Sequence, residues 1–76
     1  MERIAVSSSN IASAGFDETT HEMEIGFKRK GGGESVYSYP NVTHAQWADF
    51  LQATSKGTWF SQNLRGNPNH PATKIG

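Results

Sequence analysis

The sequence has no cysteine and no excess charge of either sign. Its 76 residues include seven Lys or Arg and seven Asp or Glu, so the formal net charge is zero. The lack of cysteine excludes disulfides and thiolate metal sites. Zero net charge disfavours a protein that binds duplex nucleic acid mainly through its phosphates, because such binding needs surplus cations.

Long apolar runs are also absent. No stretch reaches the roughly 18 apolar residues that cross a bilayer, and the N-terminal residues lack the apolar core of a signal peptide. Together with the lack of cysteine, this predicts a soluble protein of the reducing cytoplasm.

The chain is long enough for one small domain. A domain of about 60 to 80 residues buries only about 60% of its unfolded surface, so its core is marginally stable. Because disulfides are excluded, tight packing and self-association remain as the two sources of extra stability. A homo-oligomer is therefore one of two open alternatives.

Charges are unevenly distributed along the chain. Acidic residues concentrate before residue 35, and Asp49 is the only later one. Lys56, Arg65 and Lys74 follow residue 50 with no acid among them. This distribution predicts a local basic surface in the C-terminal third, despite the neutral total.

The first two predicted strands differ in the clarity of their pattern. Residues 5–16 are small and weakly patterned, and we predict one strand there. Within residues 21–28, Met23, Ile25 and Phe27 alternate with polar residues. That alternation is typical of an antiparallel strand with one buried face.

The next segment predicts a hairpin. Gly31, Gly32 and Gly33 separate two strand patterns, and glycine reaches positive φ without steric cost. The three cations before these glycines leave phosphate binding open as an alternative role for the loop. A third strand over residues 36–39 ends at Pro40, which has no amide hydrogen.

A helix start follows directly. Thr43 and Gln46 have the spacing of a capping box, and Val42 and Trp47 have that of a hydrophobic staple. This predicts a helix from Thr43 that ends before Gly57.

A second short helix is predicted over residues 58–65, with Phe60 and Leu64 buried at i, i+4 spacing. Residues 66–76 have nothing to bury and are predicted to form an Asn- and Pro-rich tail outside a domain of residues 1–65, disordered alone or ordered by a partner. The predicted fold class is α+β: a three-stranded antiparallel sheet followed by two helices packed on one face.

Five motifs in this order resemble a known family. They are Ser8-Ser9-Asn10-Ile11, Gly15-Phe16-Asp17, a strand ending in Phe27, Tyr37-Ser38-Tyr39 followed by Val42, and Ser55-Lys56-Gly57 before Trp59-Phe60 and Leu64-Arg65. Over residues 6–65 the chain resembles the KTSC domain, which occurs at the C-terminus of some lysyl-tRNA synthetases and alone in bacteria and phages. The triple glycine and the tail depart from that pattern. The resemblance supports the fold; the family has no settled function, and RNA binding has been conjectured for it.

Catalytic and metal-binding patterns are missing. His21, His44 and His70 lack the i, i+4 spacing of a helical metal site, and no serine lies in a Gly-x-Ser-x-Gly elbow. Glu22 and Glu24 share a strand face, but it is the predicted solvent face. We therefore expect no enzyme activity, no metal and no cofactor.

Two groups of residues are candidate ligand contacts. Tyr37 and Tyr39 project from the same face of a strand, where they either pack in the core or form a stacking platform. One buried ring and one ring lining a groove would satisfy both interpretations.

The second group lies at the start of the second helix. Ser55, Lys56 and Gly57 would place an ammonium group and free amides together, where ordinary helix capping is the alternative. Trp59 is expected to be exposed because Phe60 faces the core, and Asn63 and Arg65 follow on the same helix.

These residues suggest a non-catalytic binding module that captures or sequesters a nucleotide-type anionic ligand. One alternative is a protein-interaction or inhibitor module of a phage or bacterium, which contacts a host protein through Trp59 and the tail. Another is an RNA-binding accessory domain, which predicts steep salt dependence. Self-association would build the pocket from two chains.

Overall fold

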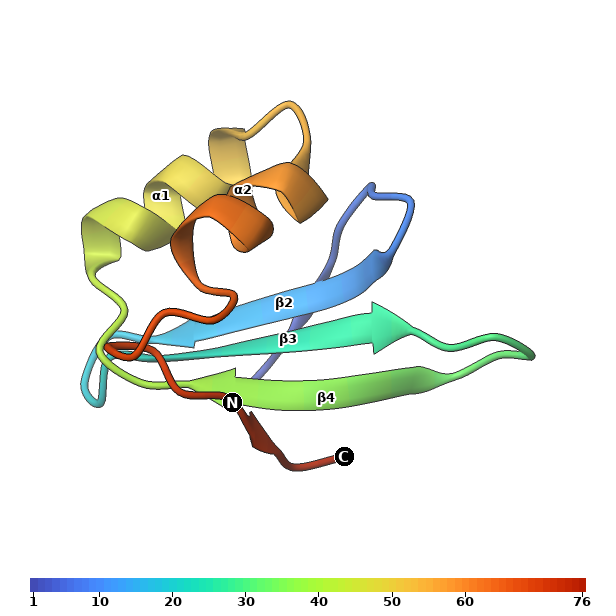
Figure 1. Ribbon diagram of the computed structural model, residues 1–76, viewed down its shortest axis with the longest axis horizontal. Helices are drawn as coiled ribbons and strands as arrows, with labels where there is room; N and C mark the ends of the chain where they lie inside the picture. The colour runs from blue at the N-terminus through green and yellow to red at the C-terminus, as the bar shows by residue number, and fades with distance from the viewer.

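The computed structural model describes all 76 residues and contains a five-stranded antiparallel sheet with two helices on one face (Figure 1). The elements are β1 (Ile4–Ala5), β2 (Ile11–Asp17), β3 (Glu22–Lys28), β4 (Glu34–Tyr39), α1 (His44–Gln52), α2 (Lys56–Asn63) and β5 (Thr73–Lys74). The strands lie in chain order, β1-β2-β3-β4-β5.

The predicted α+β class is confirmed, but the sheet has five strands and not three. The two additional strands, β1 and β5, are two residues each and lie at the two edges. Strands this short have no alternation to detect, since a period of two needs several residues to become visible. Residues 5–16 also divide, so that only the second part forms β2.

The central strand β3 follows the predicted alternation. Met23 and Ile25 are fully buried beneath the helices, whereas Glu22 and Glu24 lie on the opposite face of the sheet. Residues directly opposite in β4 share these faces, so Tyr39 lies beside Met23 and Tyr37 beside Ile25. Both tyrosines therefore face the helices.

The β3–β4 hairpin is confirmed. Gly31, Gly32 and Gly33 have φ values of 91°, 112° and 76°, a region that side chains with a Cβ rarely adopt. Arg29 and Gly33 close the loop with a backbone hydrogen bond of 3.1 Å.

Helix α1 begins as predicted. The Thr43 hydroxyl accepts a hydrogen bond from the Gln46 amide at 3.1 Å, and the Gln46 side-chain oxygen accepts one from the Thr43 amide at 2.9 Å. This is a complete capping box.

Helix α2 begins two residues earlier than predicted. Ser55 is its N-cap and accepts a hydrogen bond from the Thr58 amide at 3.3 Å. Gly57 therefore lies in the first turn and does not separate the helices. Its lack of a side chain is needed there, because a Cβ would lie 2.7 Å from the Asn10 side-chain oxygen.

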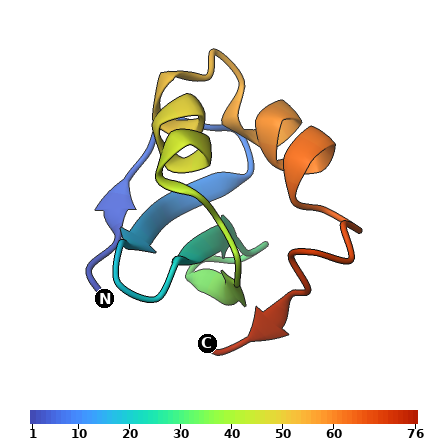
Figure 2. The same ribbon diagram turned by 90° about the vertical axis from the view of Figure 1, so that its left-hand side faces the viewer.

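The core lies between the helices and the sheet (Figure 2). It is made of apolar side chains from β2, β3, β4, α1, the connection after β4 and the C-cap of α2: Ile11, Ala14, Met23, Ile25, Tyr39, Val42, Phe50 and Leu64. Aromatic rings pack around this core. Neither helix has the length and apolar character to cross a membrane.

Tyr39 is the one core residue with an ionisable group. Its side chain is 4% exposed. Burial, and to a smaller extent the nearby Tyr37 hydroxyl, raises the pKa of Tyr39 to about 12. The phenol is therefore neutral at physiological pH.

The C-terminal segment is held against the domain, so the expectation that it buries nothing is wrong. His70 is 6% exposed, and its Nδ1 lies 2.8 Å from the Pro40 carbonyl oxygen. The Asn41 side chain donates to the Asn69 carbonyl at 2.9 Å, and β5 pairs with β4. A carbonyl only accepts, so Nδ1 of His70 carries the proton.

We predict that His70→Ala lowers the free energy of unfolding by about 1–3 kcal/mol, because the substitution leaves a carbonyl unpaired and removes a buried ring. Urea denaturation measures this loss. The matched control is His44→Ala: the His44 ring is 70% exposed and contacts an equally exposed Glu18, so the change should stay below about 1 kcal/mol. Equal effects would contradict the role given to His70.

Tyr39 predicts a dependence of stability on alkaline pH. The unfolded phenol titrates near 10.0 and the folded one near 12, so the unfolded state loses its proton first as pH rises. The contribution of Tyr39 is complete below about pH 10 and decreases between pH 10 and 12. The unfolding free energy of wild type, measured across this range, should fall relative to that of Tyr39→Phe as the pH rises.

Candidate functional site

The predicted site residues at the start of α2 make hydrogen bonds and contacts within the protein itself. The Ser55 hydroxyl caps the helix and also donates to the Thr58 hydroxyl at 2.9 Å. Lys56 is half-buried, and its ammonium group donates to the Ala53 carbonyl at 3.3 Å and lies 5.9 Å from the centre of the Phe50 ring. These contacts turn Lys56 inward, towards the junction of the two helices.

The prediction that Trp59 is exposed is wrong. Its ring is half-buried and meets Phe50 of α1 edge to face, with 5.5 Å between the ring centres. Its neighbour Phe60 contacts Phe27 and Tyr39 of the sheet, at 5.1 and 5.5 Å. Helix α2 has neighbours on two sides, so two adjacent residues that diverge by about 100° both find apolar partners.

At the end of α2, Asn63 is held in hydrogen bonds to the backbone, whereas Arg65 is exposed. The Asn63 side chain donates to the Trp59 carbonyl at 2.8 Å, and its own carbonyl accepts from Asn67 at 3.1 Å. Asn63 therefore stabilises the helix end. Arg65 follows the helix and is exposed.

The two tyrosines differ in burial, but not as the compromise interpretation predicts, because the buried Tyr39 lines a pocket and Tyr37 lines none. Tyr39 is buried in the core, whereas Tyr37 is half-buried and packs edge to face on Phe27 at 5.9 Å. Lys74 of β5 lies opposite Tyr37 in the sheet and is exposed.

A pocket of about 350 Å³ lies between α2, the sheet and the C-terminal segment; we call it the α2 pocket. It is lined by rings, aliphatic groups and a few polar side chains: Tyr39, Phe60, Leu64, Arg65, Gly66, Asn67, Pro68, His70, Pro71 and Ala72. Its size is within the range of small-ligand sites.

The charge of the α2 pocket has one sign. Arg65 is its cation, and no acidic residue lines it. Tyr39 lines the pocket with a phenol, which is neutral at physiological pH and can donate a hydrogen bond to an anion. His70 is already bound to the Pro40 carbonyl through Nδ1.

Of the predicted contacts, the pocket contains only Tyr39 and Arg65. Ser55 and Gly57 instead line a separate polar groove with Asn10, and Tyr37 lies at the sheet edge beside Lys74. The sequence prediction missed the wall formed by residues 66–72. Only the alternation of Asn and Pro there marks a segment of turns, and it does not indicate which surface the segment covers.

The arrangement provides binding chemistry. It offers ring surface, a guanidinium group and a neutral phenol around an apolar space. No group of three or more His, Asp or Glu side chains is placed to hold a metal ion.

Comparison with known proteins identifies the family. The KTSC domain model matches residues 7–67, which is most of the chain. The crystal structure of the KTSC domain protein YPO2434 from Yersinia pestis is similar, with a TM-score of 0.84 and 36% sequence identity over 99% of this chain and 97% of that one. No curated protein matches the chain. Sequence pattern and fold thus agree, and the chain belongs to the KTSC domain family.

Proposed function

We propose that this KTSC domain is a non-catalytic binding module that captures a nucleotide-type anionic ligand in the α2 pocket. The observation that supports this best is the pairing of an apolar, ring-lined space with a cation and no acid. A base is flat and apolar on its faces, whereas a phosphate needs positive charge and donors. The lining of the α2 pocket offers both kinds of contact.

The two parts of such a ligand would have different contacts. The base would lie against Phe60 and the proline-containing segment, because stacking on a ring is favourable by about 1–3 kcal/mol per base. The phosphate would bind Arg65, whose planar guanidinium suits bidentate contacts with phosphate oxygens. The neutral Tyr39 hydroxyl would donate a hydrogen bond.

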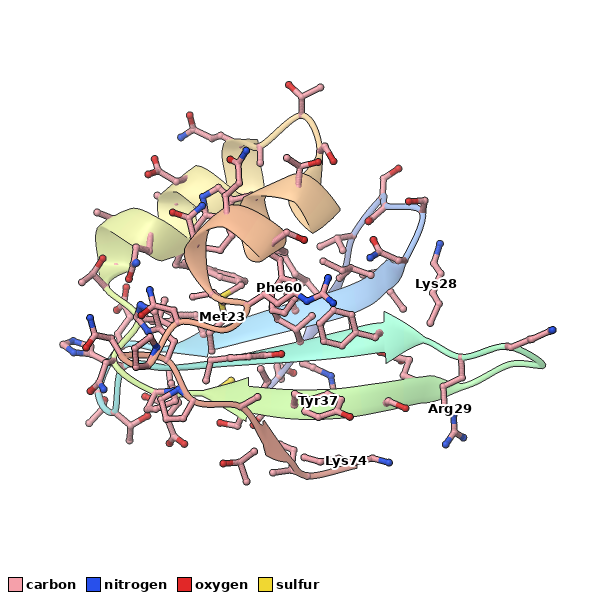
Figure 3. All side chains as sticks on the ribbon, in the orientation of Figure 1. Met23, Lys28, Arg29, Tyr37, Phe60 and Lys74 are labelled. Carbon is pink, nitrogen blue, oxygen red and sulfur yellow. The ribbon has the colours of Figure 1, made fainter.

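A short single-stranded RNA is the second candidate ligand. Lys74 lies opposite Tyr37 in the sheet, and Lys28 and Arg29 appear in the same half of the view in Figure 3. The Lys28 ammonium group donates to the Ser8 carbonyl at 2.6 Å. Rings beside cations are the usual surface for single strands. The neutral net charge argues for fewer phosphate contacts and hence for the smaller ligand.

The protein-interaction alternative has lost its main support. It relied on an exposed Trp59 and a free tail, but Trp59 packs on Phe50 and residues 73–74 pair with β4.

The prediction is that mono-, di- or cyclic nucleotides stabilise the protein in a thermal-shift screen. At a hundredfold excess over Kd, a ligand that binds only the folded state adds about 2.7 kcal/mol. Arg65→Ala should weaken that binding at least tenfold by removing the phosphate contact. Isothermal titration calorimetry measures the change in Kd.

Lys30→Ala is the matched control, because Lys30 is an exposed cation in the hairpin and does not line the pocket. It should leave nucleotide affinity unchanged. Equal losses for both variants would indicate general charge attraction and reject the α2 pocket as the site. A flat nucleotide screen with a salt-dependent shift for RNA would favour the second candidate, and no shift for either would reject both.

A further inference from the structure

A second groove lies at the other edge of the sheet, where residues of β1 and the end of β2 meet Trp47 of α1. We call it the β1 groove; its volume is about 510 Å³. It is lined by apolar, aromatic and acidic residues: Met1, Glu2, Ile4, Ala14, Gly15, Phe16, Asp17, Glu18 and Trp47. None of them lines the α2 pocket, so the two sites are separate.

The apolar part of the β1 groove has stacked aromatic rings that pack on the core and an exposed aliphatic side chain. The Phe16 and Trp47 rings stack with centres 5.8 Å apart and planes 18° apart. Trp47 in turn stacks on the fully buried Phe50 at 5.7 Å, which fixes this wall to the core. Ile4, which also lines the groove, is 51% exposed.

The charge of the groove is predominantly negative. Three carboxylates, Glu2, Asp17 and Glu18, line it; the terminal ammonium group of Met1 is the one cation among the lining residues, and it forms no ion pair with any of them. Asp17 Oδ1 accepts from the Thr19 and Thr20 amides, and Glu18 Oε1 lies 2.8 Å from His44 Nδ1. These contacts use one oxygen of each carboxylate, so the second oxygen of each can accept another donor.

The nearest Lys or Arg in the sequence does not neutralise the groove. Arg3 donates to Ser13 at 3.1 Å and pairs with Glu24 at 3.1 Å. Glu24 lies on the face of the sheet opposite Met23 and Ile25, away from the helices. The groove therefore combines apolar surface with an excess of negative charge.

We propose that the β1 groove binds an arginine side chain of a partner protein. The aliphatic stem of arginine covers apolar surface while its head remains polar, and here the stem would lie between Ile4 and Trp47. The guanidinium group carries five donors in a fixed plane, and a carboxylate accepts two of them in parallel. Lysine offers a more strongly hydrated point charge and fits less well.

The test uses nitrogen-15 NMR of the intact protein with a blocked tripeptide, acetyl-Gly-Arg-Gly-amide. We expect saturable shifts of Ile4, Phe16, Glu18 and the Trp47 indole N–H. The lysine peptide should bind at least threefold more weakly. A citrulline peptide, which keeps the shape of arginine without its charge, should cause no shift. The double variant Glu2→Gln, Glu18→Gln should lose at least tenfold in affinity.

Asp49→Asn is the matched control, since Asp49 is an exposed acid of α1 outside the groove, and it should bind like wild type. Equal weakening by both sets of substitutions, binding of the citrulline peptide, or shifts elsewhere on the protein would overturn the proposal. Equal binding of agmatine would overturn the assignment to a protein partner and indicate a small guanidinium ligand. The outcome is independent of the α2 pocket, because no residue is shared.

Discussion

The structure depends on the packing of Phe50 between the two helices. This side chain is fully buried, stacks on Trp47 of its own helix and meets the edge of Trp59 of α2. The Lys56 ammonium group lies over the same ring. Because one ring contacts both helices, it fixes their relative positions on the sheet. Each helix then forms one wall of a cavity, α1 through Trp47 and α2 through Phe60.

The opposite charges of the two cavities follow from the order of charges along the chain. Acidic residues concentrate before residue 35, and cations follow residue 50 without acids. The strands lie in chain order, so the sheet carries the N-terminal segment to one edge and the C-terminal segment to the other. Because the sheet is a simple meander, acidic residues that lie early in the chain and basic residues that lie late in it reach opposite edges of the sheet. Interleaved strands would have mixed these charges.

Local signals in the sequence were sufficient where the structure is local. The capping box of Thr43 with Gln46, the alternation in β3 and the glycine hairpin each depend on residues close in sequence, and the structure contains all three. Trp59 was misplaced because its partner Phe50 comes from another helix, and periodicity within α2 cannot indicate a second neighbour. The position of His70 depends on the Pro40 carbonyl, which any residue could provide, so no side-chain pattern marks it.

The boundary of the family match bears on what the family assignment implies for the candidate site. The match ends at residue 67, whereas Pro68, His70, Pro71 and Ala72 form one wall of the α2 pocket. The helices and the sheet, which position Phe60 and Tyr39, lie almost wholly within the match. The sequence pattern of the family therefore constrains one side of the pocket and leaves the other to a segment held by backbone contacts. Two KTSC domains with the same core could thus differ in what this pocket accepts, which makes the closing segment the part of the chain where selectivity would arise.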